Sequence, residues 1–160
     1  MKELLEILKG QAFFEGLTEA QLKLVAACGA LRSFEAGRYL FREHEPADAF
    51  YLIRSGRVSL ESPLPGRRAG AFMTLGGGDM LGWSWLIPPY RWHYDARAPE
   101  PVHTVHFDAA VLRERMEHDP VLGYALHQRF TVLIVERLQA ARLQHLDIYA
   151  GEEGDVGLGG

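Results

Sequence analysis

Cysteine and long apolar runs are nearly absent from this sequence of 160 residues. Its single cysteine, Cys28, excludes an intramolecular disulfide framework, a zinc site made of several cysteines and a conventional iron–sulfur cluster. No apolar run approaches the roughly 20 residues of a transmembrane helix, and charged residues interrupt the apolar N-terminus where a signal peptide needs its core. We therefore expect a cytoplasmic protein without a membrane partner, whose length suits one folded domain.

An excess of basic residues is also missing. The sequence has 17 Lys and Arg against 21 Asp and Glu, for a formal net charge of −4. Four acids and no base lie in residues 147–160, so residues 1–146 are formally neutral. This balance gives no signal for binding nucleic acid or an anionic membrane. Half of residues 151–160 are glycine, and we expect residues 147–160 to form a flexible acidic tail.

The apolar residues that are present change their spacing along the chain. Thr18 and Gln21 can form a capping box at the start of an N-terminal helix. Between residues 39 and 107 the apolar stretches are short and separated by Gly, Pro and Asp, which is typical of antiparallel strands. Asp108 can cap a further helix that stops before Pro120. The pattern predicts an α+β fold: an antiparallel β-roll or jelly roll flanked by N-terminal helices and a long C-terminal helix.

The segment 121–146 is typical of a long helix, because only Gly123 interrupts it. At 100° per residue it carries two apolar stripes on nearly opposite sides. One stripe comprises Leu122, Leu126, Phe130, Leu133, Ile134, Leu138 and Ala141, and the other comprises Val132, Val135, Leu143 and Leu146. Arg137 interrupts the first stripe. One stripe can pack on the sheets, and the second predicts a homodimer through residues 121–146. The alternative is a core helix of a monomer.

Four segments of the sequence together resemble one family. The glycine-anchored β-roll motifs of cyclic-nucleotide-binding domains resemble residues 34–41 and 48–58. The usual N-terminal helical entry of these domains is similar to residues 13–18. The approach to their phosphate-binding cassette resembles residues 75–82. The resemblance covers about residues 13–146. It implies that residues 1–146, including the helix 121–146, form a domain related to the sensor halves of catabolite activator and FNR-type regulators.

The sequence departs from this family in the cassette itself. The family places a Gly-Glu pair on a short helix, where the Glu accepts from the ribose, and about nine residues later an Arg that binds the cyclic phosphate together with backbone amides. Here Gly82 is retained, but Trp83 stands at the Glu position and Trp92 at the Arg position. Arg91 is adjacent, but in an extended segment a shift of one residue turns the side chain to the other face. The resemblance therefore implies weak or no binding of cAMP and cGMP.

Three interpretations of this segment stay open. In the first, Trp83, Trp85, Tyr90, Trp92 and Tyr94 fill the former pocket as core, with Pro88 and Pro89 stiffening the loop. In the second, aromatic walls and the polar groups of Ser84, Arg91, His93, Asp95 and Arg97 bind another small molecule. In the third, Arg91 shifts into register and a cyclic nucleotide binds. The candidate ligand-binding residues are Gly82, Trp83, Ser84, Arg91, Trp92 and His93.

The seven histidines raise the possibility of a metal or haem site. His103 and His106 are three apart in an expected strand, so they point to opposite faces and make a poor ligand pair. No set of nucleophile, base and orienting residue is evident, so we predict no enzyme activity. The alternative from another class is a jelly-roll protein that binds a metal or haem.

These observations predict a non-catalytic, stand-alone regulatory or sensor module. After Leu146 the sequence has fourteen residues, and a DNA-binding domain needs about 50 or more. We therefore expect no nucleic-acid binding by this chain alone. The expected partners are a second copy of the chain and an unidentified small molecule or protein, with no certain cofactor. The alternative within the same class is a genuine cAMP or cGMP sensor that uses Arg91.

Overall fold

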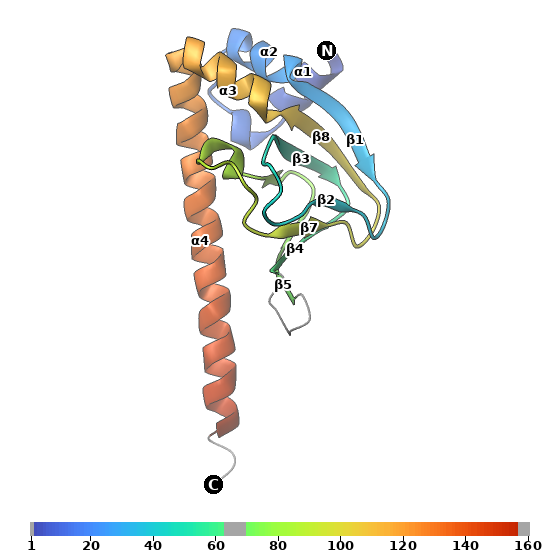
Figure 1. Cartoon of the computed structure of the whole chain (residues 1–160), viewed down its shortest axis with the longest axis vertical. Helices are drawn as coiled ribbons and strands as arrows, with labels where there is room; N and C mark the ends of the chain where they lie inside the picture. The colour runs from blue at the N-terminus through green and yellow to red at the C-terminus, as the bar shows by residue number, and fades with distance from the viewer. Residues whose placement is uncertain (1, 63–69, 157–160) are drawn as a thin grey trace.

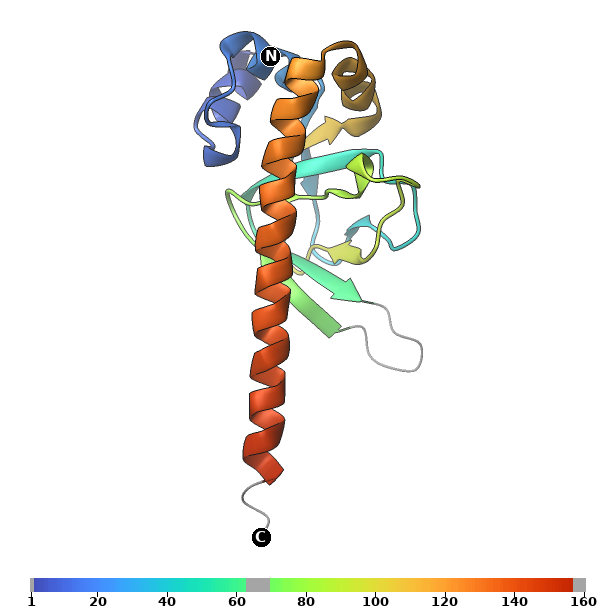
Figure 2. The same ribbon diagram turned by 90° about the vertical axis from the view of Figure 1, so that its left-hand side faces the viewer.

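The computed structural model of the chain describes residues 2–62 and 70–156, with side chains up to Arg142. The chain begins with α1 (Lys2–Lys9), the short 3-10 helix η1 (Ala12–Phe14) and α2 (Glu19–Ala27), and it ends with α3 (Ala109–His118) and α4 (Pro120–Val156). Figure 1 shows the N-terminal helices and α3 gathered at one end of the strands, while α4 passes along one side and extends well beyond them. The same arrangement is visible from the side in Figure 2.

Eight strands lie between these helices. They are β1 (Gly29–Phe34), β2 (Tyr39–Phe41), β3 (Ala49–Ser55), β4 (Val58–Ser62), β5 (Gly70–Leu75), β6 (Met80–Leu81), β7 (Asp95–Arg97) and β8 (Val102–Asp108). One sheet has the order β1-β8-β3-β6 and the other β2-β7-β4-β5, and the strand pairs in both are antiparallel. The predicted α+β fold with an antiparallel β-roll is confirmed.

Two helix starts follow from capping residues in the sequence. The Thr18 hydroxyl accepts from the backbone N–H of Gln21 at 3.1 Å, and the Gln21 side-chain oxygen accepts from the backbone N–H of Thr18 at 2.9 Å. Asp108 accepts from the backbone N–H of Val111 at 3.1 Å at the start of α3. Each contact satisfies a backbone donor that the first helical turn leaves free. The predicted caps are therefore present.

Strand β3 is the centre of the core, because both of its faces are covered. Phe50, Tyr51, Leu52 and Ile53 are all buried. The Phe50 ring lies 5.2 Å from Phe130 of α4, whereas the Tyr51 ring lies 6.0 Å from Phe34 of β1. Successive side chains of a strand point to opposite faces, so one face of β3 packs on the long helix and the other faces the interior of the roll.

The long helix packs on the roll through most of the predicted first stripe. Leu122, Leu126, Phe130 and Leu133 are buried, but Leu138 is 67% exposed and Ala141 is also exposed. Arg137 takes the next inward position, where its Nη2 donates to the backbone oxygen of Met80 at 2.7 Å. Only the N-terminal part of the first stripe therefore packs on the roll, because the helix turns Leu138 and Ala141 toward solvent.

The C-terminal boundary of this helix also differs from the expectation. Helix α4 continues through residues 147–156 rather than ending near Leu146. The side chains of Leu143 and Leu146, which were assigned to the second stripe, lie outside the described residues. Residues 157–160 of the expected tail lie there as well.

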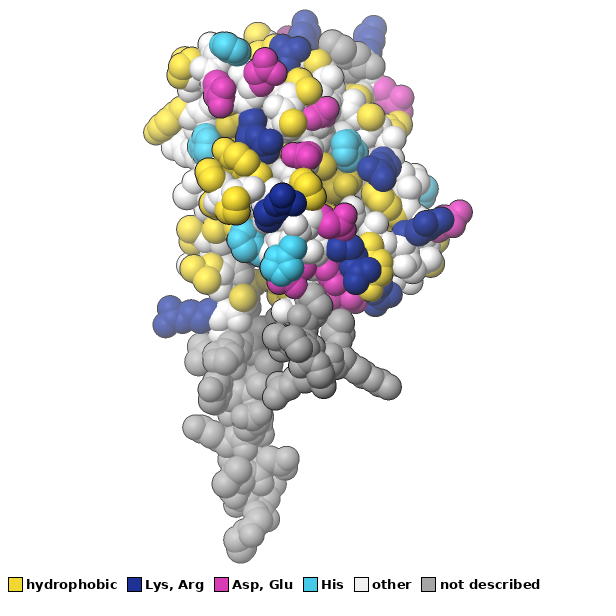
Figure 3. Space-filling view, viewed as in Figure 1, with side chains coloured by type: hydrophobic (Ala, Val, Ile, Leu, Met, Phe, Trp, Pro, Cys, Tyr) yellow, Lys and Arg dark blue, Asp and Glu magenta, His cyan; other side chains and the backbone are white. Residues whose placement is uncertain are grey.

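Two surface properties bear on possible partners. In the described residues no helix combines the length and the apolar character that a membrane span requires. Figure 3 shows Lys and Arg side chains interspersed with Asp and Glu over the visible face of the roll, without a large patch of one sign. This distribution agrees with the formal neutrality of residues 1–146.

Candidate ligand-binding cassette

The cassette, residues 82–93, connects β6 to β7 and contains the 3-10 helix η2 (Ser84–Leu86). Strand β6 pairs with β3 in one sheet, whereas β7 pairs with β2 and β4 in the other. The two ends of the cassette are therefore anchored in different sheets.

Gly82 and Trp92 fit together closely. The Trp92 indole is 3% exposed and stacks on Phe41 of β2, with ring centroids 3.6 Å apart and an interplanar angle of 6°. Gly82 has φ of +103°, and a Cβ built on it would lie 2.8 Å from Cη2 of Trp92. Two features therefore require glycine at position 82: its positive φ, and the close approach of the Trp92 indole, which leaves no room for a side chain.

Trp83, Ser84 and His93 form a second contact group. The Trp83 and His93 rings are nearly parallel, with centroids 5.2 Å apart. The fully buried Ser84 hydroxyl and Nδ1 of His93 are 3.0 Å apart and hydrogen-bonded. Because His93 is exposed, this group connects the interior of the cassette to the surface.

Tyr94 joins these two groups. Its ring lies 5.7 Å from Phe41, 6.5 Å from Trp83 and 5.6 Å from Phe72 of β5. Burial raises the pKa of Tyr94 to about 12, and the positive charge of Arg137 opposes that rise. The phenol is therefore neutral at physiological pH. Phe41 and Phe72 were not predicted as site residues, since both come from distant strands with no local signal.

Arg91 lies apart from the other candidate residues. Its side chain is exposed, and Nη1 donates to the backbone oxygen of His44 at 3.3 Å. The backbone of Arg91 also forms an isolated bridge with Pro46. Both contacts are with the loop between β2 and β3. The guanidinium therefore points away from the buried indole of Trp92.

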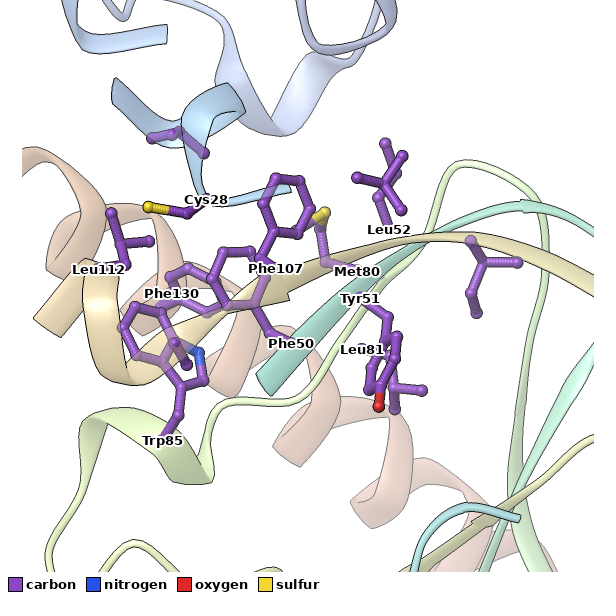
Figure 4. Close-up of a cluster of buried hydrophobic side chains, with 14 of the residues drawn as sticks. Cys28, Phe50, Tyr51, Leu52, Met80, Leu81, Trp85, Phe107, Leu112 and Phe130 are labelled. Carbon is purple, nitrogen blue, oxygen red and sulfur yellow. The ribbon is translucent and has the colours of Figure 1, made fainter. Parts of the chain in front are cut away.

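Trp85 belongs to the core rather than to the aromatic group of the cassette. It is fully buried, stacks on Phe50 at 4.9 Å and meets Phe130 edge-on at 5.1 Å. Figure 4 shows these rings together with Phe107. The indole Nε1 of Trp85 has no hydrogen-bond partner among the described residues. Trp85 thus ties the cassette to β3 and α4.

Arg113 of α3 fixes the outer side of the cassette. Its Nη1 donates to the backbone oxygen of Trp85 at 2.8 Å, and its guanidinium lies 4.2 Å over the ring of Tyr90. Nη2 lies 3.5 Å from the carboxylate of Asp48. Arg113 was not predicted as a site residue, because its partners are distant in sequence and two of its hydrogen bonds go to backbone oxygens, the second to Ala47.

The polar candidates of β7 already have partners within the protein. Arg97 donates to the buried carboxylate of Glu61 at 2.8 Å. The buried carboxylate of Asp95 accepts from the backbone N–H of Glu43 at 2.7 Å and lies 3.5 Å from Nε of Arg42. These ion pairs join β4, β7 and the loop after β2. Asp95 and Arg97 therefore stabilise the roll.

Arg137 approaches the roll from α4. Besides its bond to Met80, its Nη1 lies 3.8 Å from the sulfur of Met73 on β5. Burial lowers the pKa of Arg137, and the nearby carboxylate of Asp79 opposes that effect. A groove of about 870 Å³ runs between α4 and this part of the roll. The break that Arg137 makes in the apolar stripe was the sequence signal for this contact.

The histidines do not form a metal-ligand set in the part of the chain that the structure describes. No group of three His, Cys, Asp or Glu residues there is arranged to bind a metal ion. His103 is hydrogen-bonded to the Ser33 hydroxyl at 2.8 Å, whereas the His106 ring packs on Tyr51 at 5.3 Å. The two histidines face different surroundings, as their spacing in β8 predicts.

A family model describes most of this architecture. The model of the cyclic nucleotide-binding domain matches residues 31–119, more than half of the chain. The chain belongs to the cyclic nucleotide-binding domain family. Domains of this family are regulatory modules, and most are non-catalytic. The resemblance inferred from the sequence is confirmed.

Individual relatives extend the similarity beyond the matched residues. A crystal structure of a Geobacter metallireducens protein assigned to cyclic nucleotide binding is 33% identical, covers 83% of this chain and 96% of its own, and superimposes with a TM-score of 0.75. A cGMP-dependent protein kinase of Toxoplasma gondii is 27% identical over 88% of this chain. A CRP-like cAMP-activated global transcriptional regulator of Mycobacterium tuberculosis is 26% identical over 76%. This chain spans 13% of the kinase and 54% of the regulator.

Proposed function

We propose that this cyclic nucleotide-binding domain is a non-catalytic regulatory module whose cassette does not bind cAMP or cGMP tightly. The observation that carries the proposal is the environment of Trp92, which stands at the position of the family's phosphate-binding Arg. It is buried between the ring of Phe41 and the backbone of Gly82. An indole has no positive charge and a single donor, so it cannot replace a guanidinium that binds a phosphate with two hydrogen bonds.

The energetic argument supports the same conclusion. Loss of a guanidinium–phosphate pair removes a few kcal/mol, or about two orders of magnitude in affinity. At the ribose position Trp83 stacks on His93 and offers no acceptor for a sugar hydroxyl. The contact of Arg91 with His44 directs that guanidinium toward another loop. No side chain in this arrangement therefore substitutes for the missing pair.

The proposed partner of the module is a second copy of itself, bound through α4. Large apolar side chains on the solvent side of this helix are exposed: Val121, Tyr124, Val132, Val135 and Leu138. Burying such a stripe against the same stripe of a second helix is favourable by about 25 cal/mol per Å², and a two-fold axis matches identical surfaces. Light scattering should give twice the chain mass of 18.0 kDa. Leu138→Glu should return the mass to 18.0 kDa.

Calorimetric titration of the full chain with cAMP and with cGMP tests the cassette proposal. We expect no binding in the micromolar range, and a micromolar dissociation constant for either nucleotide would refute the proposal. The paired variant Trp83→Glu with Trp92→Arg restores the two family side chains. A gain of nucleotide affinity in this variant would show that the two indoles are the reason for weak binding by the wild-type chain. Arg91→Ala is the matched control, because it alters a neighbouring charge outside the buried group.

Two alternatives give different results in the same experiments. If Arg91 serves a genuine nucleotide sensor, the wild-type chain binds a cyclic nucleotide and Arg91→Ala loses about a hundredfold in affinity. If the module binds a metal or haem, purified protein contains a stoichiometric metal. Both results are distinct from the expected absence of nucleotide binding and of bound metal.

A further inference from the structure

Strand β1 forms an open edge of the first sheet. In the order β1-β8-β3-β6 it pairs only with β8, over all six of its residues and without a bulge. Residues Ala30 to Ser33 are all exposed, and Figure 1 places the strand on the side of the roll away from α4. The edge strands β2 and β6 have only three and two residues, and β5 lies beside α4. Among the described residues, β1 is therefore the longest strand edge that no other element covers.

The backbone of β1 directs the groups of two residues toward this open edge. The backbone oxygen of Cys28, just before the strand, accepts from a backbone N–H at the end of β8 at 2.8 Å, and that of Arg32 accepts from the Thr104 hydroxyl at 2.8 Å. Both oxygens therefore face β8. Alternate residues of a strand direct their backbone groups to opposite edges, so those of Leu31 and Ser33 point outward. Such outward groups are a template for pairing with another extended chain.

A positively charged hollow lies beside the open edge. Its volume is about 310 Å³, its charged or titratable lining residues are Arg32, Arg54 and His103, and no carboxylate lines it. Arg32 and Arg54 are exposed, and neither forms an ion pair with a described carboxylate. Arg32 lies 4.9 Å over the ring of Phe34 in the same strand, so its guanidinium stays beside the edge. The charge there favours acidic side chains on an added strand.

The same charge disfavours a second copy of the chain at this edge. Two β1 strands that paired through the outward groups of Leu31 and Ser33 around a two-fold axis would place their Arg32 side chains directly opposite each other. Like charges directly opposite each other destabilise a strand pair, whereas opposite charges stabilise it. An acidic strand therefore fits this edge better than β1 of a second copy does.

We propose that the β1 edge binds an extended acidic segment of another protein, which adds a strand to the sheet. The backbone of the segment pairs with the outward groups of Leu31 and Ser33, and an acidic side chain lies opposite Arg32. In this mode of recognition the backbone contacts supply affinity and the side-chain positions supply specificity. The edge and the hollow share no residue with the cassette or with α4, so the inference does not rest on the proposed function.

A blocked, fluorescein-labelled heptapeptide of alternating glutamate and valine tests the charge preference, with fluorescence anisotropy and the full chain. We expect a dissociation constant below about 1 mM, and about tenfold or more weaker binding when lysine replaces glutamate in the peptide. Arg32→Glu should weaken binding of the acidic peptide about five- to tenfold, because an attractive pair becomes a repulsive one. Lys23→Glu makes the same reversal of charge at an exposed position of α2. It is the matched control and should bind as the wild type does.

Two further measurements test the backbone pairing. N-methylation removes a backbone donor, so methylating the alternate peptide residues that face β1 should abolish binding, whereas methylating the intervening residues should leave it unchanged. In hydrogen exchange of the complex followed by NMR, the N–H groups of Leu31 and Ser33 should exchange about tenfold or more slowly than in the free chain. The N–H of Thr74, on the edge strand β5, should exchange at an unchanged rate.

Several results would overturn the proposal. They are no binding of the acidic peptide, equal binding of the lysine peptide, the same effect of both methylation patterns, unchanged exchange at Leu31 and Ser33, or wild-type affinity in Arg32→Glu with wild-type circular dichroism. The cyclic-nucleotide titrations and the measurements of mass use other ligands and other readouts. The proposals for the cassette, for α4 and for the β1 edge can therefore fail independently of one another.

Discussion

Two aromatic groups in this protein are each built on a tryptophan that stacks on a phenylalanine. In the core stack, which we define as Phe50, Trp85, Phe107 and Phe130, the Trp85 and Phe50 rings are 4.9 Å apart and inclined by 17°. In the cassette cluster, defined as Phe41, Trp83, Trp92, His93 and Tyr94, the Trp92 and Phe41 rings are 3.6 Å apart and inclined by 6°. Both tryptophans come from the same cassette.

The two groups differ in their polar contacts. In the core stack, Nε1 of Trp85 has no partner among the described residues, and the other three members are apolar. In the cassette cluster, the exposed ring of His93 stacks on Trp83 and is hydrogen-bonded to Ser84. Burial without polar partners is typical of core packing. The cassette therefore contributes one indole to the core and two others to a cluster that reaches the surface through His93.

The largest expected effect follows from removing the tryptophan of the core stack. Trp85→Ala should lower the free energy of unfolding by about 3 to 5 kcal/mol, because it leaves a cavity among rings of β3, β8 and α4. Equilibrium unfolding in urea measures this change. Trp83→Ala is the comparison, and it should cost clearly less because Trp83 is only half-buried. An equal or larger loss for Trp83→Ala would contradict the division into a packing group and a surface-linked group.

A smaller effect is expected from adding a methyl group at Gly82, which lies against Trp92 of the cassette cluster. Gly82→Ala should destabilise the domain by about 2 to 5 kcal/mol, since a left-handed conformation costs a side chain about 1 to 2 kcal/mol and overpacking costs about 1 to 3. The new Cβ would lie 2.8 Å from Trp92. Urea unfolding again provides the measurement.

A double variant separates the two causes. In a Trp92→Ala background the collision disappears, so the added cost of Gly82→Ala should fall to about 1 to 2 kcal/mol, the conformational part alone. Strictly additive losses in the double variant would show that the indole and the glycine are energetically independent. The comparison of the two aromatic groups would then lose its geometric basis on the cassette side.

The smallest expected effect concerns pH and His106 of β8. Burial lowers the pKa of His106 from its usual value of 6.5, so the folded state favours the neutral ring. As the pH falls below about 6.5 the unfolded chain takes up the proton first, and the free energy of unfolding decreases. His106→Gln should flatten this decrease in urea unfolding measured from about pH 8 to pH 5. His118→Gln, at an exposed position of α3, is the matched substitution, and an equal flattening in both variants would refute the assignment to His106.

Much of the fold was predictable because its signals are local. The reciprocal contact of Thr18 with Gln21 and the cap at Asp108 depend on residues three apart, and the short apolar stretches between turn residues marked the strands. The candidate site was only partly predictable. Gly82, Trp83, Ser84, Trp92 and His93 do lie together, whereas Arg91 does not. The direction of the Arg91 side chain depends on a backbone bridge to Pro46, in a loop more than forty positions earlier. No local feature of the sequence predicts this bridge.

The sequence by itself determined the fold class and the helix caps, since each depends on residue type and short-range spacing. Only the tertiary structure decided that Trp85 packs in the core while Trp92 covers Gly82, and that Arg137 rather than Leu138 faces the roll. These outcomes depend on which distant strands and helices meet, because burial and stacking are set by contacts between elements.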